Sequence, residues 1–203
     1  MEIVTGAGMA RAELDEAGPA EQVRFLLVLT HGAGGSIGSP DLLAARGAAL
    51  GLGGLVAQVT QPYRVRGARA PGSAVRQDAA WVEIVAALTQ LAPGVPLVQG
   101  GRSNGARVAC RTAAAVGARA VIALAFPLRP PGPAGQSRVA ELRAAGAGGA
   151  AVLVVNGERD PFGIPGAGDA DRVVTVPGET HALKGHRAVI AEAVADWLPG
   201  VLR

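Results

Sequence analysis

VQGGRSNGARVAC, residues 98–110, places Ser103 between two glycines at the point where an apolar run ends. Gly101 lies two residues before the serine and Gly105 two residues after it, which gives the pattern G-x-S-x-G. A strand–turn–helix elbow exposes such a serine and aims the N–H groups of the next helix toward it. The pattern alone is a weak signal in a chain with 30 glycines, because a strand-to-helix turn with a capping serine produces the same pattern.

Apolar runs alternate along the whole chain with alanine-rich runs in which apolar residues recur at helical spacing. The expected strands cover residues 23–30, 54–60, 96–100, 120–128, 151–157 and 171–178. The expected helices cover residues 41–50, 73–91, 104–117, 136–146 and 184–198. Because the strands are continuous apolar runs, we expect helices on both faces of the sheet. Strands that alternate with helices predict an α/β fold with a mostly parallel, doubly wound sheet.

The length of the chain predicts a single domain over residues 1–203, since domains usually hold roughly 50–250 residues. Residues 1–22 are a possible antiparallel hairpin at one edge of the sheet. The only interruption rich in proline and glycine covers residues 127–136, and we expect it to form a short loop. A loop of this length is too short to form a lid domain.

Composition and charge exclude several classes of protein. Hydrophobic residues make up 49% of the chain and charged residues 17%, which favours a compact globule over a disordered chain. The net charge is +3, but Lys184 is the only lysine and the arginines form no run, so we do not expect nucleic-acid binding. Histidines, cysteines and carboxylates show no metal-ligand spacing, so we expect neither a metal nor a cofactor.

The expected compartment follows from the single cysteine and the apolar runs. Cys110 stands alone, which excludes an intramolecular disulfide. Residues 1–18 are acidic and lack the apolar stretch of a signal peptide, and nowhere do 18 apolar residues run together. We therefore expect a cytoplasmic protein with no membrane association.

The loop THGAGGSIG, residues 30–38, follows an expected strand, and its three spaced glycines fit a dinucleotide-binding turn. An NAD(P)-dependent short-chain dehydrogenase would need an acidic or basic residue near the end of the next strand, where Gln58 stands. Such an enzyme also needs a lysine four residues after its tyrosine, but the only tyrosine, Tyr63, is followed there by Gly67. This interpretation is therefore the weakest of the alternatives.

Two residues later in the chain match the partners that a nucleophilic serine needs. A serine hydroxyl is a poor nucleophile unless a base takes its proton, and in this kind of fold the acid precedes the histidine. Asp160 follows the strand AVLVVNG, and His181 follows the strand DRVVTVPG. Both positions fall at the carboxyl ends of expected parallel strands, where open α/β sheets place their sites. We therefore predict that Ser103, Asp160 and His181 form the catalytic residues.

The chain offers few other candidates for the base and the acid. His31 precedes the serine and lies in the first glycine loop, where we expect it to brace the loop by hydrogen bonds. His186 lies near the start of the last expected helix and is the alternative base. Glu158 and Asp169 are the alternative acids, although a solvated turn position suits the first and a strand flank the second. The preferred acid is followed by a proline, which fixes its turn.

The oxyanion that forms during acyl transfer requires two N–H donors. One usually comes from the residue after the nucleophile, which is Asn104, and the other from the loop after an earlier strand. Ala33 is the expected second donor, with Gly34 as the alternative. Both predictions concern backbone groups.

Arginines near the serine suggest a substrate preference. Arg102 adjoins the nucleophile, and Arg64, Arg66 and Arg129 lie in loops within reach of the same edge. One hypothesis is that Arg102, Arg64 and Arg129 bind a negative group on the acyl substrate. The alternative is that these arginines face solvent or brace the loops.

Five motifs together resemble a known family. They are LLVLTHGAGG (26–35), GGRSNGARVA (100–109), ALAFPLRPPG (123–132), VNGERDPFG (155–163) and THALKGH (180–186). Taken in this order, they are similar to the small lidless α/β-hydrolases of the dienelactone-hydrolase-like superfamily, and most of all to its testis-expressed-protein type branch. The resemblance covers nearly everything from Phe25 to Trp197 and implies the α/β-hydrolase fold and the Ser103–Asp160–His181 triad.

The resemblance does not imply a substrate. Dienelactone hydrolases use a cysteine nucleophile, and Ser103 occupies that position here, so their particular activity is not implied. Cys110 lies on the following helix, where we expect a small buried hydrophobic residue. The leading hypothesis is a serine hydrolase that acts on small ester-type acyl substrates through an acyl-enzyme. The alternative is a non-catalytic binding or scaffold protein with the same fold.

Overall fold

A computed structural model describes residues 1–16, 18, 22–130 and 135–203 of the chain. Parts of the expected hairpin (1–22) and of the expected loop (127–136) therefore lie outside the described residues. The eight strands of one sheet are β1 (Glu2–Thr5), β2 (Gly8–Glu16), β3 (Phe25–Thr30), β4 (Gly54–Thr60), β5 (Leu97–Arg102), β6 (Ala120–Leu124), β7 (Ala151–Gly157) and β8 (Arg172–Val176). Their order across the sheet is β1-β2-β4-β3-β5-β6-β7-β8.

The sheet is parallel from β4 to β8, and only β1 and β2 run antiparallel to their neighbours. These two strands form a hairpin at one edge, and β2 joins it to β4. The parallel strands all end at the same rim of the sheet, so the loops that follow β3, β5, β6, β7 and β8 gather there. This rim is where the sequence places its candidate residues.

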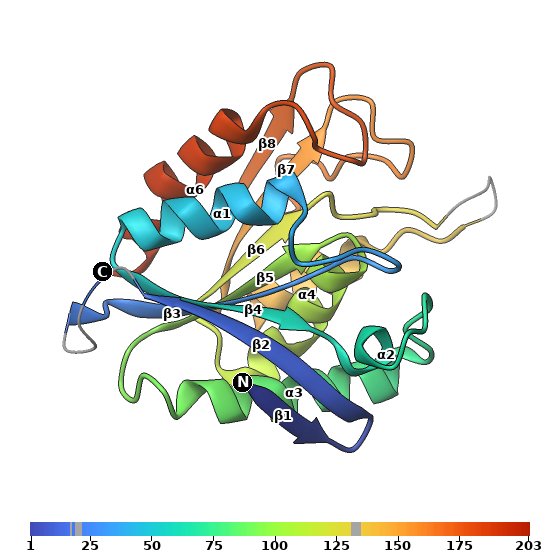
Figure 1. Ribbon diagram of the computed structural model, residues 1–203. Helices are drawn as coiled ribbons and strands as arrows, with labels where there is room; N and C mark the ends of the chain where they lie inside the picture. Colours follow the sequence, from blue (N-terminus) through green and yellow to red (C-terminus); the bar gives the residue numbers. More distant parts are fainter. Residues whose placement is uncertain (17, 19–21, 131–134) are drawn as a thin grey trace.

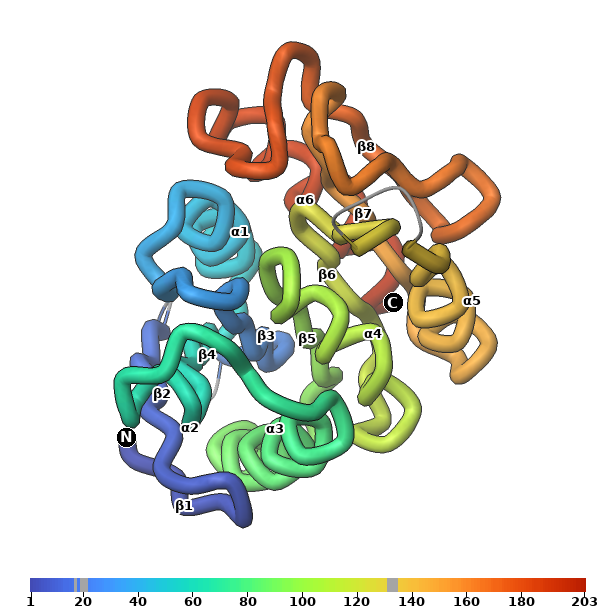
Figure 2. Tube along the Cα trace, turned by 90° about the vertical axis from the view of Figure 1, so that its right-hand side faces the viewer, coloured from blue at the N-terminus to red at the C-terminus, as the bar shows by residue number. Residues whose placement is uncertain are grey.

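Helices cover both faces of the sheet, which confirms the predicted α/β fold (Figure 1). The helices are α1 (Pro40–Gly51), α2 (Pro62–Val65), α3 (Ala74–Thr89), α4 (Asn104–Val116), α5 (Val139–Ala147) and α6 (Arg187–Val201). Figure 2 shows α1 beside the sheet on the opposite side from α3 and α4. The apolar side chains divide in the same way, because α1 and α6 pack into one buried cluster and α3, α4 and α5 into the other.

Each core cluster is built mainly from aliphatic side chains, as a composition with 3% aromatic residues requires. Trp81 of α3 is the largest fully buried side chain, and its indole N–H donates to the Oε1 atom of Gln99 at 2.7 Å. Cys110 of α4 is buried in the same cluster, and this burial raises the pKa of its thiol. Apolar packing therefore holds the helices against the sheet, and the few polar groups inside the core form hydrogen bonds there.

The glycines of the serine motif are required by close packing. A Cβ atom on Gly101 would lie 2.7 Å from the carbonyl oxygen of Thr30, and one on Gly105 would lie 2.7 Å from that of His31. Such distances are shorter than real Cβ contacts. Small residues at these two positions therefore let α4 leave β5 while lying directly against the end of β3.

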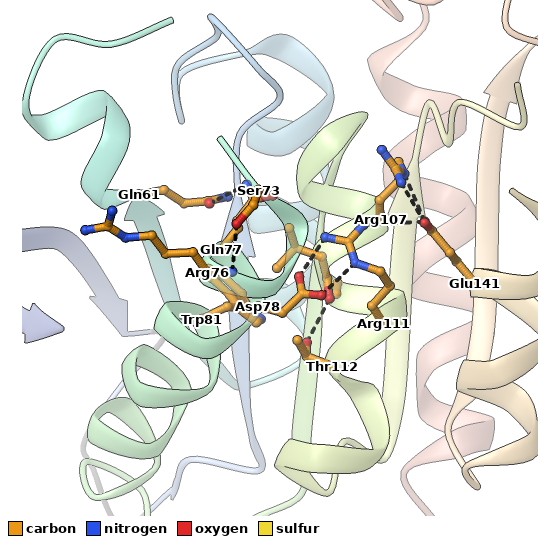
Figure 3. A network of polar contacts seen from close by, with 12 residues as sticks. Gln61, Ser73, Arg76, Gln77, Asp78, Trp81, Arg107, Arg111, Thr112 and Glu141 are labelled. Carbon is orange, nitrogen blue, oxygen red and sulfur yellow. Dashed lines mark hydrogen bonds and ion pairs between the residues drawn. The ribbon is translucent and has the colours of Figure 1, made fainter. Parts of the chain in front are cut away.

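A polar network links the three helices on one face of the sheet (Figure 3). Arg111 of α4 donates two hydrogen bonds to Asp78 of α3, at 2.8 and 2.6 Å. Arg107 of α4 makes a similar fork with Glu141 of α5, at 2.9 and 2.6 Å. These bidentate pairs tie α4, the helix that follows the candidate serine, to both neighbouring helices.

Two elements differ most from the sequence expectation. Strand β6 ends at Leu124 rather than at 128, because Ala125 adopts a positive φ of 46° and turns the chain out of the strand. The short helix α2 is absent from the expected elements, since only Pro62 at its first turn signals it. Among the described residues, no helix is long and apolar enough to cross a membrane.

Candidate active site

Ser103 occupies a strained position between β5 and α4. Its φ of 54° and ψ of −112° lie outside the regions that non-glycine residues usually adopt. The strain is maintained because the Ser103 N–H donates to the carbonyl oxygen of Leu124, at 2.8 Å, while its own carbonyl accepts from Arg107 in α4. This geometry turns the Ser103 side chain out of the strand and onto the rim of the sheet.

The structure brings together the three side chains that the sequence singled out. The Nε2 atom of His181 lies 2.9 Å from Oγ of Ser103, and its Nδ1 atom lies 2.8 Å from Oδ2 of Asp160. The carboxylate can only accept, so the imidazole carries its proton on Nδ1 and leaves Nε2 free to accept from the serine hydroxyl. Residues 78 and 21 positions apart in the chain thus form one continuous hydroxyl–imidazole–carboxylate chain.

Asp160 is buried and held in place by several donors. Its Oδ1 atom accepts from the backbone N–H of Phe162 at 2.9 Å, and its Oδ2 atom also accepts from the amide of Asn156 at 3.3 Å. The side chain of Asp160 has no exposed surface, whereas 19% of the side chain of His181 is exposed. The carboxylate is therefore fixed by the protein, and the imidazole lies at the boundary with solvent.

Asn156 is a site residue that sequence reasoning missed. It is the last residue but one of β7, and its amide forms two hydrogen bonds with the backbone of Phe126, at 2.8 and 2.9 Å. It also donates to the carboxylate of Asp160 and so links the end of β6 to the loop that carries the acid. The available signal was a single polar residue at the end of the apolar run AVLVVNG.

The loop that carries His181 is organised by a carboxylate and by packing. Glu179 accepts from the backbone N–H of Gly185 at 2.6 Å and from the ring of His186 at 2.9 Å. The ring of Phe162 packs edge-on against the imidazole of His181, with 4.5 Å between ring centroids. His186, the alternative base, contacts Glu179 and lies largely exposed at the start of α6.

The first glycine loop lies against the serine. A Cβ atom on Gly32 would lie 3.1 Å from Cβ of Ser103, so the loop after β3 and the elbow after β5 are in direct contact. His31 is fully buried behind the loop and accepts from the N–H of Gln61, while its Nδ1 atom lies 2.9 Å from the Gly32 carbonyl oxygen. Burial lowers the pKa of His31, so the ring stays neutral and braces the loop.

The two expected oxyanion donors lie on the elements that meet at the serine. Asn104 is the first residue of α4, whose N–H groups in the first turn have no partner within the helix. Ala33 is exposed in a tight turn that the Gly35 N–H closes onto the Gly32 carbonyl at 3.0 Å. Both backbone positions therefore lie at the rim.

Arg102 is held within the protein. Its Nε atom lies 2.9 Å from Oδ2 of Asp41, whose side chain has no exposed surface, and 19% of the Arg102 side chain is exposed. Its Nη2 atom donates to the backbone carbonyl of His181 at 2.8 Å. Burial raises the pKa of the Asp41 carboxyl, and the nearby Arg102 guanidinium opposes this shift only in part. The Arg102 geometry favours a bracing role over a substrate contact.

Arg64 also braces a loop. It donates to the carbonyl oxygens of Gly35 and Ala68, at 3.1 and 3.2 Å, and thereby ties α2 to the first glycine loop. Arg129 is exposed, and its backbone N–H donates to the Phe162 carbonyl oxygen. Among the described residues, Arg102 and Arg64 have side-chain hydrogen bonds to protein carbonyls, so the hypothesis of a substrate contact is left mainly to Arg129.

Ser103 and His181 are both partly exposed at the rim of the sheet. Of the two hollows described, the larger has a volume of about 640 Å³, and it is lined mainly by residues of α5, the start of β7, the segment 168–171 before β8 and the C-terminal end of α6. The smaller, about 20 Å³, lies beside Tyr63 and Trp81. Neither hollow is lined by Ser103 or His181. Within residues 1–16, 18, 22–130 and 135–203, no group of three His, Cys, Asp or Glu side chains is arranged to hold a metal ion.

An α/β sheet with a serine elbow on its rim and an imidazole within hydrogen-bond distance is the arrangement of the α/β hydrolases. The chain belongs to this family, because residues 23–175 match the alpha/beta hydrolase domain. No curated protein matches the sequence. The family match ends before His181, so it covers two of the three candidate residues.

Solved structures share the fold at low sequence identity. Est1E from Butyrivibrio proteoclasticus superimposes with a TM-score of 0.78 at 17% identity, covering 99% of this chain and 98% of that one. An α/β serine hydrolase without a lid from Xanthomonas campestris gives 0.74 at 21% identity, with 98% and 94% covered. A dienelactone hydrolase from Anabaena variabilis gives 0.76 at 16% identity, with 100% and 97% covered. At these identities the likeness establishes the fold alone.

Proposed function

We propose that this protein is a serine hydrolase that cleaves small ester-type acyl substrates through Ser103, His181 and Asp160. The observation that carries the proposal is the hydrogen-bonded chain from the serine hydroxyl through the imidazole to the buried carboxylate, at 2.9 and 2.8 Å. The strained backbone of Ser103 supports the same conclusion, because strain of this kind concentrates at functional sites.

The first step would be acylation. His181 takes the proton of the Ser103 hydroxyl at Nε2 while the serine oxygen attacks the carbonyl carbon of the ester. The tetrahedral oxyanion accepts hydrogen bonds from the backbone N–H groups of Asn104 and Ala33. When the intermediate collapses, the imidazolium returns its proton to the leaving alcohol. Asp160 holds the tautomer throughout and stabilises the charged imidazole.

The second step would release the acid. Water enters from the open rim, His181 takes one of its protons, and the resulting hydroxide attacks the acyl carbon. The second tetrahedral intermediate then collapses as Ser103 recovers its proton from the imidazolium. The products are a carboxylic acid and the free enzyme, so neither a metal nor an organic cofactor enters this scheme.

The short interruption at residues 127–136 favours small substrates. A loop of this length cannot form a lid domain that would enclose a long acyl chain. The edge-on ring of Phe162 offers one apolar surface beside the imidazole. Est1E has been solved with ferulic acid bound, which places a small carboxylic acid on a structurally similar protein. Short-chain esters are therefore the proposed substrate class.

The motifs GGRSNGARVA and THALKGH also support a place in the testis-expressed-protein type branch of the dienelactone-hydrolase-like superfamily. The serine at position 103 separates this chain from dienelactone hydrolases, which use cysteine. This assignment also predicts that a fluorophosphonate probe labels Ser103, since it relies on the same serine.

A fluorophosphonate probe tests the proposal directly, because it reacts with activated serines. We expect the wild-type protein to be labelled at Ser103 and Ser103→Ala to remain unlabelled. Hydrolysis of p-nitrophenyl acetate is expected to fall by at least about 1,000-fold in Ser103→Ala and His181→Ala. Ser36→Ala, which removes an exposed serine of the first glycine loop, is the matched control and should retain labelling. An unlabelled wild-type protein would favour the non-catalytic scaffold instead.

A further inference from the structure

Three segments of the site meet at the guanidinium of Arg102. Asp41 lies at the start of α1, Arg102 ends β5 directly before the serine, and His181 lies in the loop after β8. The Nε atom of Arg102 lies 2.9 Å from the carboxylate of Asp41, and its Nη2 atom donates to the backbone carbonyl of His181 at 2.8 Å. A Cβ atom on Gly32 would lie 3.4 Å from Nη1, so the same side chain also packs under the first glycine loop.

From this arrangement we propose that Arg102 is a positioning residue, which is anchored by Asp41 and holds the backbone of His181 so that the imidazole stays within reach of Ser103. The proposal rests on the proposed function, since it assigns a role in the same reaction. It replaces the hypothesis that Arg102 binds a negative group on the substrate, because the guanidinium already forms an ion pair with Asp41 and a hydrogen bond to the His181 carbonyl.

The planar guanidinium suits this role for a geometric reason. Nε and Nη2 belong to one rigid planar group, so the ion pair at Nε limits where Nη2 can lie. The carboxylate of Asp41 has no exposed surface and lies within a helix, and it therefore provides a stable anchor. A lysine at this position would present one ammonium group on a flexible stem and would not hold both contacts in this fixed relation.

Among the described residues, the other hydrogen bond between the His181 loop and the serine elbow is the one between the imidazole and Ser103. The imidazole reaches Ser103 from a segment 78 residues further along the chain. Loss of the carbonyl contact would let the His181 backbone drift relative to the hydroxyl, and a displacement of about 1 Å lowers a rate on the order of 100-fold. Substrate binding would be affected less, because the contact involves no substrate atom.

Arg102→Met, Asp41→Asn, Arg102→Lys and the double variant Arg102→Met/Asp41→Asn test the proposal. We expect Arg102→Met to lower kcat for p-nitrophenyl acetate roughly 100-fold while KM changes less than about threefold. The rate of fluorophosphonate labelling should fall by a similar factor. Arg102→Lys should recover only part of this loss. Arg119→Met is the matched control, since Arg119 donates to the carbonyl of Val201 at the same 2.8 Å and contacts no site residue.

The double variant separates positioning from general stability. Arg102→Met leaves a buried carboxylate without its partner, so its Tm should fall. Adding Asp41→Asn removes that charge, and we expect the Tm to recover while kcat stays as low as in the single variant. Recovery of kcat together with Tm would overturn the proposal, because it would show that Arg102 acts only by neutralising Asp41. A raised KM with unchanged kcat in Arg102→Met would also overturn it and would restore the substrate contact.

One readout is independent of catalysis. The Nδ1 proton of His181, which is shared with Asp160, should give a downfield proton NMR signal that is absent from His181→Ala. We expect this signal to be broadened or lost in Arg102→Met and retained in Arg119→Met. If the signal is unchanged in Arg102→Met, Arg102 does not position the imidazole. If the signal responds but wild-type protein is not labelled at Ser103, the positioning role stands and the proposed hydrolase function fails.

Discussion

The backbone packs closely around Ser103 because the neighbouring glycines have no Cβ atom. Gly101 and Gly105 adjoin carbonyl oxygens of the β3 end at distances where no Cβ atom fits. By contrast, a Cβ atom on Gly146 in α5 would meet no atom within 4 Å, so this glycine should tolerate substitution. Comparing the stability of alanine variants at a packed glycine and at an open one therefore measures how tightly the elbow is packed.

We expect Gly105→Ala to lower the free energy of unfolding by about 1–3 kcal/mol, since backbone atoms of Thr30 and His31 would have to move. Gly146→Ala, also in a helix, should be neutral or should raise that free energy by up to about 1 kcal/mol. Chemical denaturation of both variants measures the difference. Equal stability of the two variants would show that the elbow relaxes freely around the new methyl group.

Replacing the single side chain of Asn156 should lower both stability and activity. Asn156→Leu would leave the N–H and carbonyl groups of Phe126 without partners, which costs about 2–4 kcal/mol in the free energy of unfolding. It would also remove a donor from Asp160, so kcat should fall as well. Val155→Ala, in the same strand, is the control: it should lower stability through lost packing and leave kcat unchanged. Denaturation curves and ester kinetics for both variants test this distinction.

Among the elements, α4 is the one that connects the site to the rest of the fold. It begins at the candidate serine, and its arginines pair with carboxylates on both flanking helices (Figure 3). These pairs are partly buried, with 16–25% of each side chain exposed. Because desolvated bidentate pairs are worth more than exposed ones, they should contribute measurably to holding the elbow in place.

Glu141→Gln should lower the free energy of unfolding by about 1 kcal/mol, because both Arg107 and Arg111 lose a charged partner. The exposed pair of Glu2 and Arg11 offers the comparison, with 56% and 63% of the side chains exposed, and Glu2→Gln should change stability by less than about 0.3 kcal/mol. Denaturation at low and high salt is the measurement. A loss in Glu141→Gln no larger than in Glu2→Gln would show that the network does not stabilise α4.

For the whole molecule, the dependence of stability on pH should show which carboxylates stabilise the fold. The hydrogen bond and charge of Arg46 lower the pKa of Asp15, and this pair joins β2 to α1. A carboxyl whose folded-state pKa lies below its unfolded value stabilises the fold above the unfolded value, near 3.8, and that stability is lost as the pH falls through the lowered folded-state pKa.

Asp15→Asn should therefore cost about 0.5–1 kcal/mol at pH 7 and progressively less below pH 4. Arg46→Gln should show the same convergence with wild type, since it removes the other partner. The free energy of unfolding measured between pH 7 and pH 3 checks both variants. A difference from wild type that stays constant across this range would contradict the assignment of the pair.

The fold was predictable from the sequence because each buried strand is a continuous apolar run. β4 and β7 begin and end at the expected residues, since glycines and polar residues bound these runs. Ser103, Asp160 and His181 were predictable as candidates because each follows a strand, and parallel strands end at one rim.

The roles of Arg102 and Asn156 were not predictable in the same way. The contact between Arg102 and the His181 carbonyl spans 79 residues, and the contact between Arg102 and Asp41 depends on where two side chains point once α1 has packed. Sequence spacing places residues on elements but does not give side-chain directions across separate loops. The sequence therefore left open whether the arginines near the serine bind substrate or brace loops, and in the structure Arg102 and Arg64 bond to loop carbonyls.

Burial of the lone thiol in α4 has a practical consequence for spectroscopy. Cys110 is the only cysteine in the chain, its side chain is enclosed by the helix-packed core, and burial raises its pKa, so little thiolate exists near neutral pH. Maleimide dyes and thiol-reactive spin labels should therefore not react with the native protein. A cysteine introduced at any surface position would then carry the only reporter group, and distances across the molecule would be measurable without first deleting a natural thiol.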